Sequence, residues 1–584
     1  MTNLFQCAIG PVQDFIASAR RSRDLWYGSW LLSELAKAAA RALVDSNSRL
    51  IFPTALKPSD LDPGSTFNVP NKVVAIADIA PDSVGAAVEM AVRKRLLDLR
   101  KIAFAAVGDQ GQFKYGLAEA QVDDLPEIYW VGVEFDGTDA DYERARDVAE
   151  RTMNARKATR SFDSFKGEPF PKSSLDGVRE SVINETAYPK PGANDAEKEA
   201  KAKKIYQNFK ARPVERLSGV DILKRLGNDK PFPSTSHMAA LPFLCYVDRA
   251  GKAGNRDALL VAIRAMLKAQ EVSSDESDGA LVYSSRLAEW IPSRTKLETV
   301  TQAQEKLLHA YAGETRPGSY FALLLADGDN MGAAINNQMT IQAHQVLSKT
   351  LSQFANDVDG IVQGHEGVLI YSGGDDVLAY LPLHRALACA NELAEAFASK
   401  MDGFITKEGK SPTLSTGIVV AHHLEPLADT LEVARAAERA AKSVEGKNAL
   451  AITVSKRSGV DRTIKGKRAE LMKRLTTMIG WRRNGDISAG TPYELQRLHQ
   501  VLGDSAALQD ALTKEALRIV ERKRQSGGTA MSKEKQDATL NEFVQWLSAD
   551  NISLLEVAHE MIIANEFASA LDMACGENEE CEPE

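Results

Sequence analysis

Two short acidic turns, each at the end of an apolar strand, constrain the fold of this chain more than any other feature. The first follows the continuous apolar run 321–326 and begins with Asp327, Gly328 and Asp329. A run of this kind is typical of a strand buried on both faces. We therefore expect Asp327 to emerge where that strand ends.

The second turn connects two further apolar runs, residues 368–371 and 377–381. Its sequence, over residues 372–376, is Ser-Gly-Gly-Asp-Asp. Two glycines between such runs predict a tight β-hairpin, with Asp375 and Asp376 just past its tip. If the first strand lies beside this hairpin, three carboxylates meet.

Three carboxylates in one place cannot all stay ionised without a cation to neutralise them. Carboxylate oxygens are hard ligands, which favour Mg²⁺ or Mn²⁺. Two such ions roughly 3.5–4 Å apart can activate a ribose hydroxyl and hold a departing pyrophosphate. Gly328, Gly373 and Gly374 would let a triphosphate approach the backbone closely. The pattern therefore predicts a two-metal nucleotidyl-transfer site built on the three aspartates.

Two other interpretations of these turns were weighed against the metal site. A Gly-Gly-Asp-Asp sequence alone is most often only a hairpin turn. The Asp-Gly-Asp stretch could open a calcium loop, but that pattern needs Asn or Asp in place of Met331 and Glu in place of Gln338. The presence of both turns, each at a strand end, favours the metal site.

The segments around the two turns follow a β-α-β-β-α-β order with one appended unit. We expect helices over 342–358, 384–400 and 427–443, and strands over 414–421 and 449–454. Such a sheet places the first strand and the hairpin side by side in its middle. Lys442 and Lys447 lie where the last helix leads into a strand, and a lysine there meets either phosphate or solvent.

The first part of the chain repeats this order more weakly. Residues 4–10 predict a strand that ends in a glycine, and apolar strands are expected at 73–76 and 128–135. When Ala8–Pro11 is laid over Ala326–Asp329, both carboxylates are missing. This predicts a duplicated palm domain whose first copy lacks metal ligands and encloses the substrate site of the second. An unrelated α/β domain is the alternative.

Several motifs of this chain resemble one family in the same order. Residues 9–16, Ile-Gly-Pro-Val-Gln-Asp-Phe-Ile, and the stretch 19–33 that follows resemble the opening of the large polymerase-cyclase subunit of type III-B (Cmr) CRISPR effector complexes. The two acidic turns and Phe-Pro-Ser-Thr-Ser at 232–236 match the same family. The resemblance covers the chain up to about residue 454.

The resemblance implies an enzyme that is switched on when its crRNA-guided complex pairs with target RNA. Such an enzyme polymerises ATP into cyclic oligoadenylate second messengers, and its partners are the other subunits of the complex. The resemblance assigns metal binding to Asp327, Asp375 and Asp376. It implies that Ser372, Gly373 and Gly374 line the ATP pocket and that Lys447 meets the triphosphate. Asp329 is implied only as a supporting residue.

The chain departs from that family in two places. Many relatives begin with a His-Asp nuclease domain, but the nine histidines here include no His-Asp dipeptide, so we expect no DNase activity. Relatives also tend to carry two Cys-x-x-Cys motifs, which form a structural zinc site. Serine and aspartate replace them here, at Ser173, Asp176, Ser218 and Asp221. Serine is a poor zinc ligand, so we expect no zinc and hydrogen bonding or packing instead.

The composition predicts a cytoplasmic protein. The five cysteines show neither paired nor metal-binding spacing, which is typical of free thiols in a reducing compartment. No signal-like segment and no apolar run near twenty residues is present, so no membrane partner is expected. A net charge of −9 argues against broad, independent nucleic-acid binding. The basic groups Arg20, Arg21, Arg23 and 456–483 either touch RNA or form solvated helix faces.

We therefore expect an α+β chain with two ferredoxin-like palm domains. The expected domains are a non-catalytic palm domain over 1–165, a mainly helical middle domain over 166–312, a catalytic palm domain over 313–455 and a helical C-terminal domain over 456–584. The leading function is an ATP-polymerising cyclase. A catalytically silent scaffold of the same complex is one alternative. A stand-alone dinucleotide cyclase is another, disfavoured because Val377 stands where such enzymes have Glu-Phe.

Overall fold

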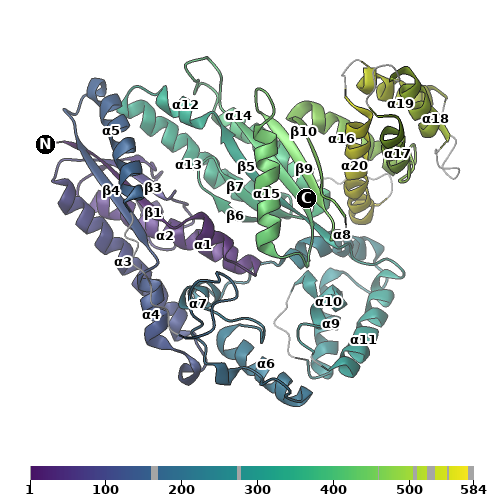
Figure 1. Cartoon of the computed structure of the whole chain (residues 1–584), viewed down its shortest axis with the longest axis horizontal. Helices are drawn as coiled ribbons and strands as arrows, with labels where there is room; N and C mark the ends of the chain where they lie inside the picture. Colours follow the sequence, from purple (N-terminus) through teal and green to yellow (C-terminus); the bar gives the residue numbers. More distant parts are fainter. Residues whose placement is uncertain are drawn as a thin grey trace.

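Two β-sheets, joined and flanked by helices, organise the chain (Figure 1). The computed structural model describes residues 2–159, 169–272, 278–291, 293–457, 459–503, 509–522, 533–548 and 552–576. The four-stranded sheet forms near the N-terminus, and the six-stranded sheet forms in the second half of the chain. The predicted α+β class is confirmed.

The first sheet is antiparallel, with the strand order β2-β3-β1-β4. Its strands are β1 Asn3–Gly10, β2 Arg49–Phe52, β3 Lys72–Ala77 and β4 Glu127–Glu134. Alternate residues of β1 point to opposite faces, because side chains of a strand repeat every two residues. Phe5 and Cys7 pack under α2 (Ser22–Asp45) and α3 (Pro81–Ala105), whereas Leu4 and Ala8 pack under α5 (Asp139–Ala158). This is the predicted ferredoxin-like order.

The second sheet has the strand order β10-β9-β8-β5-β7-β6. Its strands are β5 Tyr320–Asp329, β6 Val368–Ser372, β7 Val377–Leu381, β8 Thr413–His422, β9 Ala449–Ser455 and β10 Arg462–Lys467. Strand β5 pairs antiparallel with β7 on one side and β8 on the other, and β9 runs parallel to β8. The end of β5 that carries Asp327 therefore lies beside the β6–β7 hairpin.

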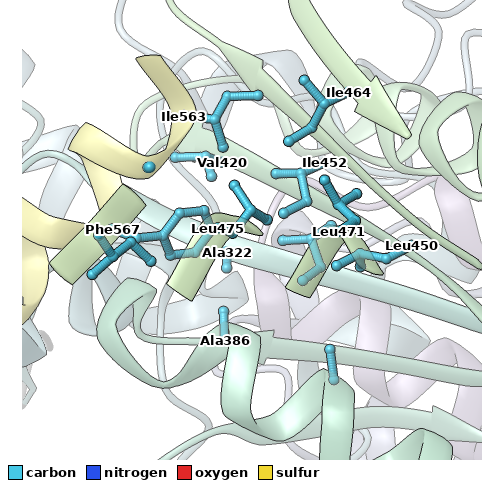
Figure 2. Packing of buried hydrophobic residues seen from close by; sticks show 14 of the residues in the cluster. Ala322, Ala386, Val420, Leu450, Ile452, Ile464, Leu471, Leu475, Ile563 and Phe567 are labelled. Carbon is cyan, nitrogen blue, oxygen red and sulfur yellow. The ribbon is translucent and has the colours of Figure 1, made fainter. Parts of the chain in front are cut away.

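Both faces of the second sheet are covered by helices. One face packs against α13 (Ile341–Gly364), α14 (Ala386–Lys400), α16 (Arg468–Arg483) and α20 (Leu554–Cys575). On that face Ala322 and Ile452 meet Leu471, Leu475 and Phe567 (Figure 2). The other face packs against α8 (Thr235–Ala250) and α15 (Leu427–Lys442). A sheet buried on both faces explains why β5 is an unbroken apolar run.

The region between the sheets is mainly helical. Its helices are α6 Asp195–Phe209, α7 Gly219–Leu226, α9 Arg256–Ala269, α10 Ser284–Leu287 and α11 Arg294–Ala312, together with α8, whereas α4 (Tyr115–Asp123) precedes strand β4 of the first sheet. The Ser173 and Ser218 hydroxyls each donate to Asp221 Oδ2 at 2.7 Å, and Asp176 pairs with Arg179 at 3.0 Å. The backbone N–H of Asp176 donates to the Ser173 hydroxyl at 3.3 Å. Hydrogen bonds therefore link all four positions that stand in for cysteines.

Two features differ from the sequence-based expectations. The region from residue 456 onward is not wholly helical, because β10 extends the palm sheet. Only Ile464 of β10 is buried, so the strand shows no apolar pattern. The expectation of free thiols holds for Cys7, Cys245 and Cys389, but Cys575 is disulfide-bonded. The remaining helices are α1 Gln13–Ala17, α12 Met331–Asn336, α17 Thr491–Leu502, α18 Gln509–Arg522 and α19 Lys533–Ser548.

Among the helices of the described ranges, none combines the length and the apolar character that a bilayer span requires.

Candidate active site

The structure brings the carboxylates of Asp327, Asp375 and Asp376 together. Each offers an oxygen, and these oxygens all lie within 4.8 Å of one another. Asp327 stands one residue beyond Ala326, which is the last residue of β5 to pair with β7, opposite Val377. The two other aspartates immediately precede Val377 in the hairpin turn. The strand register therefore brings the three side chains close together.

The surroundings of this carboxylate cluster disfavour the ionised forms of its aspartates. Burial, followed by the charge of the neighbouring Asp376, raises the pKa of Asp375 to about 7. Burial also raises the pKa of Asp376. Each shift means that the ionised form is disfavoured in the protein without a compensating cation. A positive charge placed among these oxygens would restore the ionised form of both groups.

Divalent metal ions of the hard class fit this donor set. All three side chains offer oxygen ligands, the chemistry that Mg²⁺ and Mn²⁺ prefer. The carboxylates are partly exposed, as a metal that also binds substrate requires. Asp327, Asp375 and Asp376 are thus the residues that would hold such ions.

A lysine and a glutamate from α15 complete the cluster. Lys442 Nζ contacts Asp327 and lies 3.2 Å from Glu438 Oε1. Burial, followed by Asp376, raises the pKa of Glu438. Burial, followed by the nearby Lys447, lowers the pKa of Lys442. The site therefore contains a fourth acid and a direct cationic contact that the sequence analysis did not assign.

The approach of α15 to the sheet has a local cause. A Cβ on Gly417 of β8 would lie 2.4 Å from the backbone nitrogen of Glu438. Only glycine allows this separation, since real side-chain atoms do not approach so closely. The spacing of Glu438 and Lys442 by four residues was readable in the sequence as one helix face. Their proximity to Asp327 was not, because it depends on contacts between distant segments.

Gly328 and the hairpin glycines occupy restricted positions. A Cβ on Gly328 would lie 2.8 Å from Asp375 Cβ and 2.6 Å from Met331 Cγ. A Cβ on Gly373 would overlap the Tyr371 ring, whereas Gly374 faces open space with φ of +107°. Ser372 is fully buried, and among the described residues its hydroxyl has no hydrogen-bond partner.

Asp329 and Lys447 lie at the margin of the cluster. Asp329 is fully buried, and its Oδ2 accepts hydrogen bonds from Thr413, Ser415 and the backbone of Asn448, at 2.8, 2.8 and 3.0 Å. It therefore ties β5 to β8 and to the loop before β9. Lys447 lies in that loop with φ of 52°, and its carbonyl accepts a hydrogen bond from Lys467. Neither belongs to the group of three carboxylates.

Comparisons with known proteins match both halves of this architecture. Residues 320–451 match the family described as Cas10/Cmr2, second palm domain, and residues 4–99 match CRISPR-associated protein Cmr2, N-terminal. A curated relative, the CRISPR system Cmr subunit Cmr2 of Pyrococcus furiosus, is 27% identical, with 78% of this chain covered. The chain spans 62% of that relative's length.

Two solved structures share the fold. A chain of a type III-B Cmr-beta complex in the apo state matches with a TM-score of 0.60 and 15% identity, covering 91% of this chain and 78% of that one. A chain of the Cmr-beta complex bound to cognate target RNA matches with a TM-score of 0.62 and 14% identity, covering 97% and 83%. At these identities the likeness concerns the fold.

Proposed function

We propose that the chain is a member of the Cas10/Cmr2 family, whose models match residues 320–451 and 4–99, and that it is the nucleotidyltransferase subunit of an RNA-guided type III-B effector complex. In this proposal, target RNA pairing switches the subunit on, and it polymerises ATP into cyclic oligoadenylates. The observation that carries the proposal is the meeting of Asp327, Asp375 and Asp376 at one end of the second palm sheet. Three half-buried acids within 4.8 Å of one another serve no packing purpose, since each one costs free energy when it is ionised without a partner.

The three aspartates would hold two divalent ions. Bound there, such ions would make a ribose hydroxyl a better nucleophile and neutralise a departing pyrophosphate. Asp375 would be held in its ionised form by such ions, because its pKa of about 7 reflects burial and the neighbouring charge of Asp376. Lys442, which contacts Asp327 in the absence of metal, is placed to exchange that contact for a phosphate oxygen.

The hairpin turn would supply the nucleotide side of the site. Gly374 leaves open space above its backbone, so a triphosphate can approach there without a side chain in the way. The buried Ser372 hydroxyl is an unused polar group beside it. In this proposal Lys447, at the margin of the cluster, contributes positive charge toward the triphosphate, and the first palm domain closes the substrate site from the other side.

Product analysis of the assembled complex tests this function. The purified complex is incubated with target RNA, ATP and Mn²⁺, and products are identified by mass spectrometry. We expect cyclic oligoadenylates from the wild type and less than about 1% of that amount from Asp375→Ala and from Asp376→Ala. Asp357→Ala is the matched control, because Asp357 is an exposed carboxylate on α13 that pairs with Lys400.

The other outcomes identify the alternatives. A wild-type complex that makes no product with either Mg²⁺ or Mn²⁺ would be a catalytically silent scaffold. A GTP-derived dinucleotide made without target RNA would identify a stand-alone dinucleotide cyclase. Equal product from the wild type and both aspartate variants would place the chemistry elsewhere in the complex.

A further inference from the structure

A second cavity lies at the opposite end of the palm sheet from the aspartates. It has a volume of about 680 Å³ and is lined by segments of the first palm domain, the middle region and the second palm domain. Phe321, near the start of β5, lines it, whereas Asp327 is six residues further along the same strand. At about 3.3 Å per residue, the two sites are about 20 Å apart along the sheet. The cavity is therefore separate from the carboxylate cluster.

Two of the motifs that mark the family resemblance meet in this cavity. Residues 19–23, which include the start of α2, form one wall, and residues 231–235, at the start of α8, form another. In sequence, these segments are further apart than the whole length of the expected first palm domain, and neither contributes to the carboxylate cluster. Because both segments line one cavity, we infer that they serve the same site.

The wall from residues 19–23 presents guanidinium groups to the cavity. Arg20, Arg21 and Arg23 all line it. Arg21 Nε and Nη2 and Arg23 Nε are buried, and the described part of the chain offers them no hydrogen-bond partner. Burial lowers the pKa of Arg23, and the attraction of Asp24 and Asp229 offsets this effect only in part. Buried guanidinium nitrogens without acceptors are costly unless a ligand supplies oxygens.

The acidic residues of the cavity are already engaged by other groups. Glu215 accepts hydrogen bonds from Arg225, which is outside the cavity, and from the backbone of Arg212. Glu289 pairs with Arg212 and Arg286.

The two remaining acids are engaged in the same way. Asp278 accepts from Ser234 at the start of α8, and Glu425 lies 3.8 Å from Arg457. The nearest carboxylate oxygen to Arg21 is that of Glu215, at 4.0 Å. No carboxylate of the described residues lies within ion-pairing distance of Arg20 or Arg23.

Helix ends and aromatic rings add to this environment. The first residues of α2 and α15 line the cavity, and neither helix start has a side-chain cap. Uncapped N-terminal N–H groups carry partial positive charge and favour anions. Phe232 and Tyr206 provide flat apolar walls. Guanidinium groups are suited to bind a phosphate, and aromatic walls are suited to stack against a base.

We propose that this cavity binds a nucleoside phosphate, with the phosphate on Arg20, Arg21 and Arg23 and the base against the aromatic walls. The ligand is either a free nucleotide or the phosphorylated end of an RNA strand, which share this chemistry. The volume is within the range of nucleotide-sized ligand pockets. The site does not depend on catalysis at the aspartates, so its test stands apart from that of the proposed function.

Binding to the full-length chain in the presence of EDTA tests the proposal, because chelation removes metal-dependent binding at the aspartates. The probes are fluorescently labelled ADP and a labelled four-nucleotide oligoadenylate, with and without a 5′-phosphate, measured by anisotropy. We expect saturable binding that Arg21→Gln/Arg23→Gln weakens about tenfold or more and Arg20→Glu weakens about threefold or more. Thermal melts check that each variant is folded, and Arg20 is exposed, so its replacement should not disturb the fold.

Arg41→Gln is the matched control, since Arg41 is an exposed arginine on α2 whose ion pairs with Asp45 and Asp62 lie outside the cavity. This variant should leave binding in EDTA unchanged. Binding of both ADP and phosphorylated RNA supports a free nucleotide as sufficient ligand, and binding of phosphorylated RNA alone supports a strand end. Equal binding of RNA with and without the 5′-phosphate, no saturable binding, or no effect of Arg20→Glu would overturn the proposal.

Discussion

Gly328 shows how one missing side chain shapes the candidate active site. It lies between Asp327 and the turn residue Asp375, whose Cβ would be 2.8 Å from a Cβ at position 328. The glycine therefore allows the end of β5 to touch the hairpin turn. Without that contact, the carboxylates of the two turns would be held further apart.

Gly328→Ala should lower activity while leaving the protein folded. The added methyl group must displace Asp375 or Met331, and overpacking of this kind costs about 1–3 kcal/mol. We expect product formation to fall at least about tenfold. Gly332→Ala is the control, because a Cβ there meets no atom within 4 Å. Similar activities of the two variants would show that the Gly328 contact does not position the site.

Lys442→Met should make the protein more dependent on metal for its stability. Lys442 contacts Asp327 and offsets part of the charge of the acidic cluster. In EDTA we expect a melting temperature lower by a few degrees, and a larger increase on addition of Mn²⁺ than the wild type shows.

Lys400→Met serves as the comparison for this variant. Lys400 has similar exposure and pairs with Asp357 outside the site. The interpretation is wrong if Mn²⁺ raises the melting temperatures of both variants equally.

Sequence reasoning reached the aspartates and named Lys442, but it did not place Lys442 against Asp327, and it missed Glu438. Asp327, Asp375 and Asp376 each follow or precede an apolar strand, so local pattern and strand order were enough to bring them together. Glu438 and Lys442 come from α15, whose closeness to β8 rests on the bare backbone of Gly417. Contacts of that kind involve residues far apart in sequence, and no local pattern encodes them.

At the level of elements, α5 and α13 join the two palm domains. His344 of α13 lies with Nε2 2.8 Å from Arg146 Nη1 and with Nδ1 3.1 Å from the Tyr142 hydroxyl, both on α5. Asp139, at the start of α5, accepts a hydrogen bond from the backbone of Ile341 at 2.9 Å. This junction fixes the first palm domain against the helix that covers the second sheet.

Acid should weaken the α5–α13 junction through His344. Burial, together with the nearby charge of Arg146, lowers the pKa of this imidazole to about 4, from an ordinary value near 6.5. The unfolded chain therefore binds a proton more readily, so the contribution of His344 to stability is lost as the pH falls from about 6.5 to about 4.

His344→Gln should reduce the slope of melting temperature against pH in that window. His309→Gln is the control, since the His309 side chain is 60% exposed. An unchanged slope in His344→Gln would show that other groups carry the acid sensitivity.

Helices and strands were predicted well where their buried residues recur at a regular spacing. From β5 to β9, the predicted helices and strands match the observed ones within a few residues, except that α13 extends to Gly364 and that the short helix α12 was not predicted. Strand β2 and strand β10 were missed, because β2 is only four residues long and β10 has a single buried side chain. Short or edge strands lack the alternation on which such predictions depend.

Across the whole molecule, one apolar core joins the second palm sheet to the C-terminal helices. Residues of β5, β8, α16 and α20 belong to the same buried cluster, as Figure 2 shows around Ala322, Val420 and Phe567. The expected domain boundary after residue 455 stays a prediction. The core nevertheless runs across that position without interruption.

Phe567→Ala should therefore destabilise the palm sheet as well as α20. Phe567 is 1% exposed, and removing such a side chain costs about 3–5 kcal/mol. The rates of amide hydrogen exchange measured in β5 and β8 should increase together with those in α20. Tyr493→Ala on α17 is the control, because Tyr493 is 46% exposed. Faster exchange confined to α20 would mean that the tail unfolds independently.

Strand β10 forms one open edge of the six-stranded sheet, and its side chains include Arg462, Lys465 and Lys467. An unpaired edge offers backbone donors and acceptors to any extended polypeptide nearby, including the same edge of a second copy. Three cations along such a strand repel their counterparts and discourage the growth of intermolecular sheets. The charged side chains of β10 thus explain both why sequence analysis missed this strand and how its open edge avoids pairing with other chains.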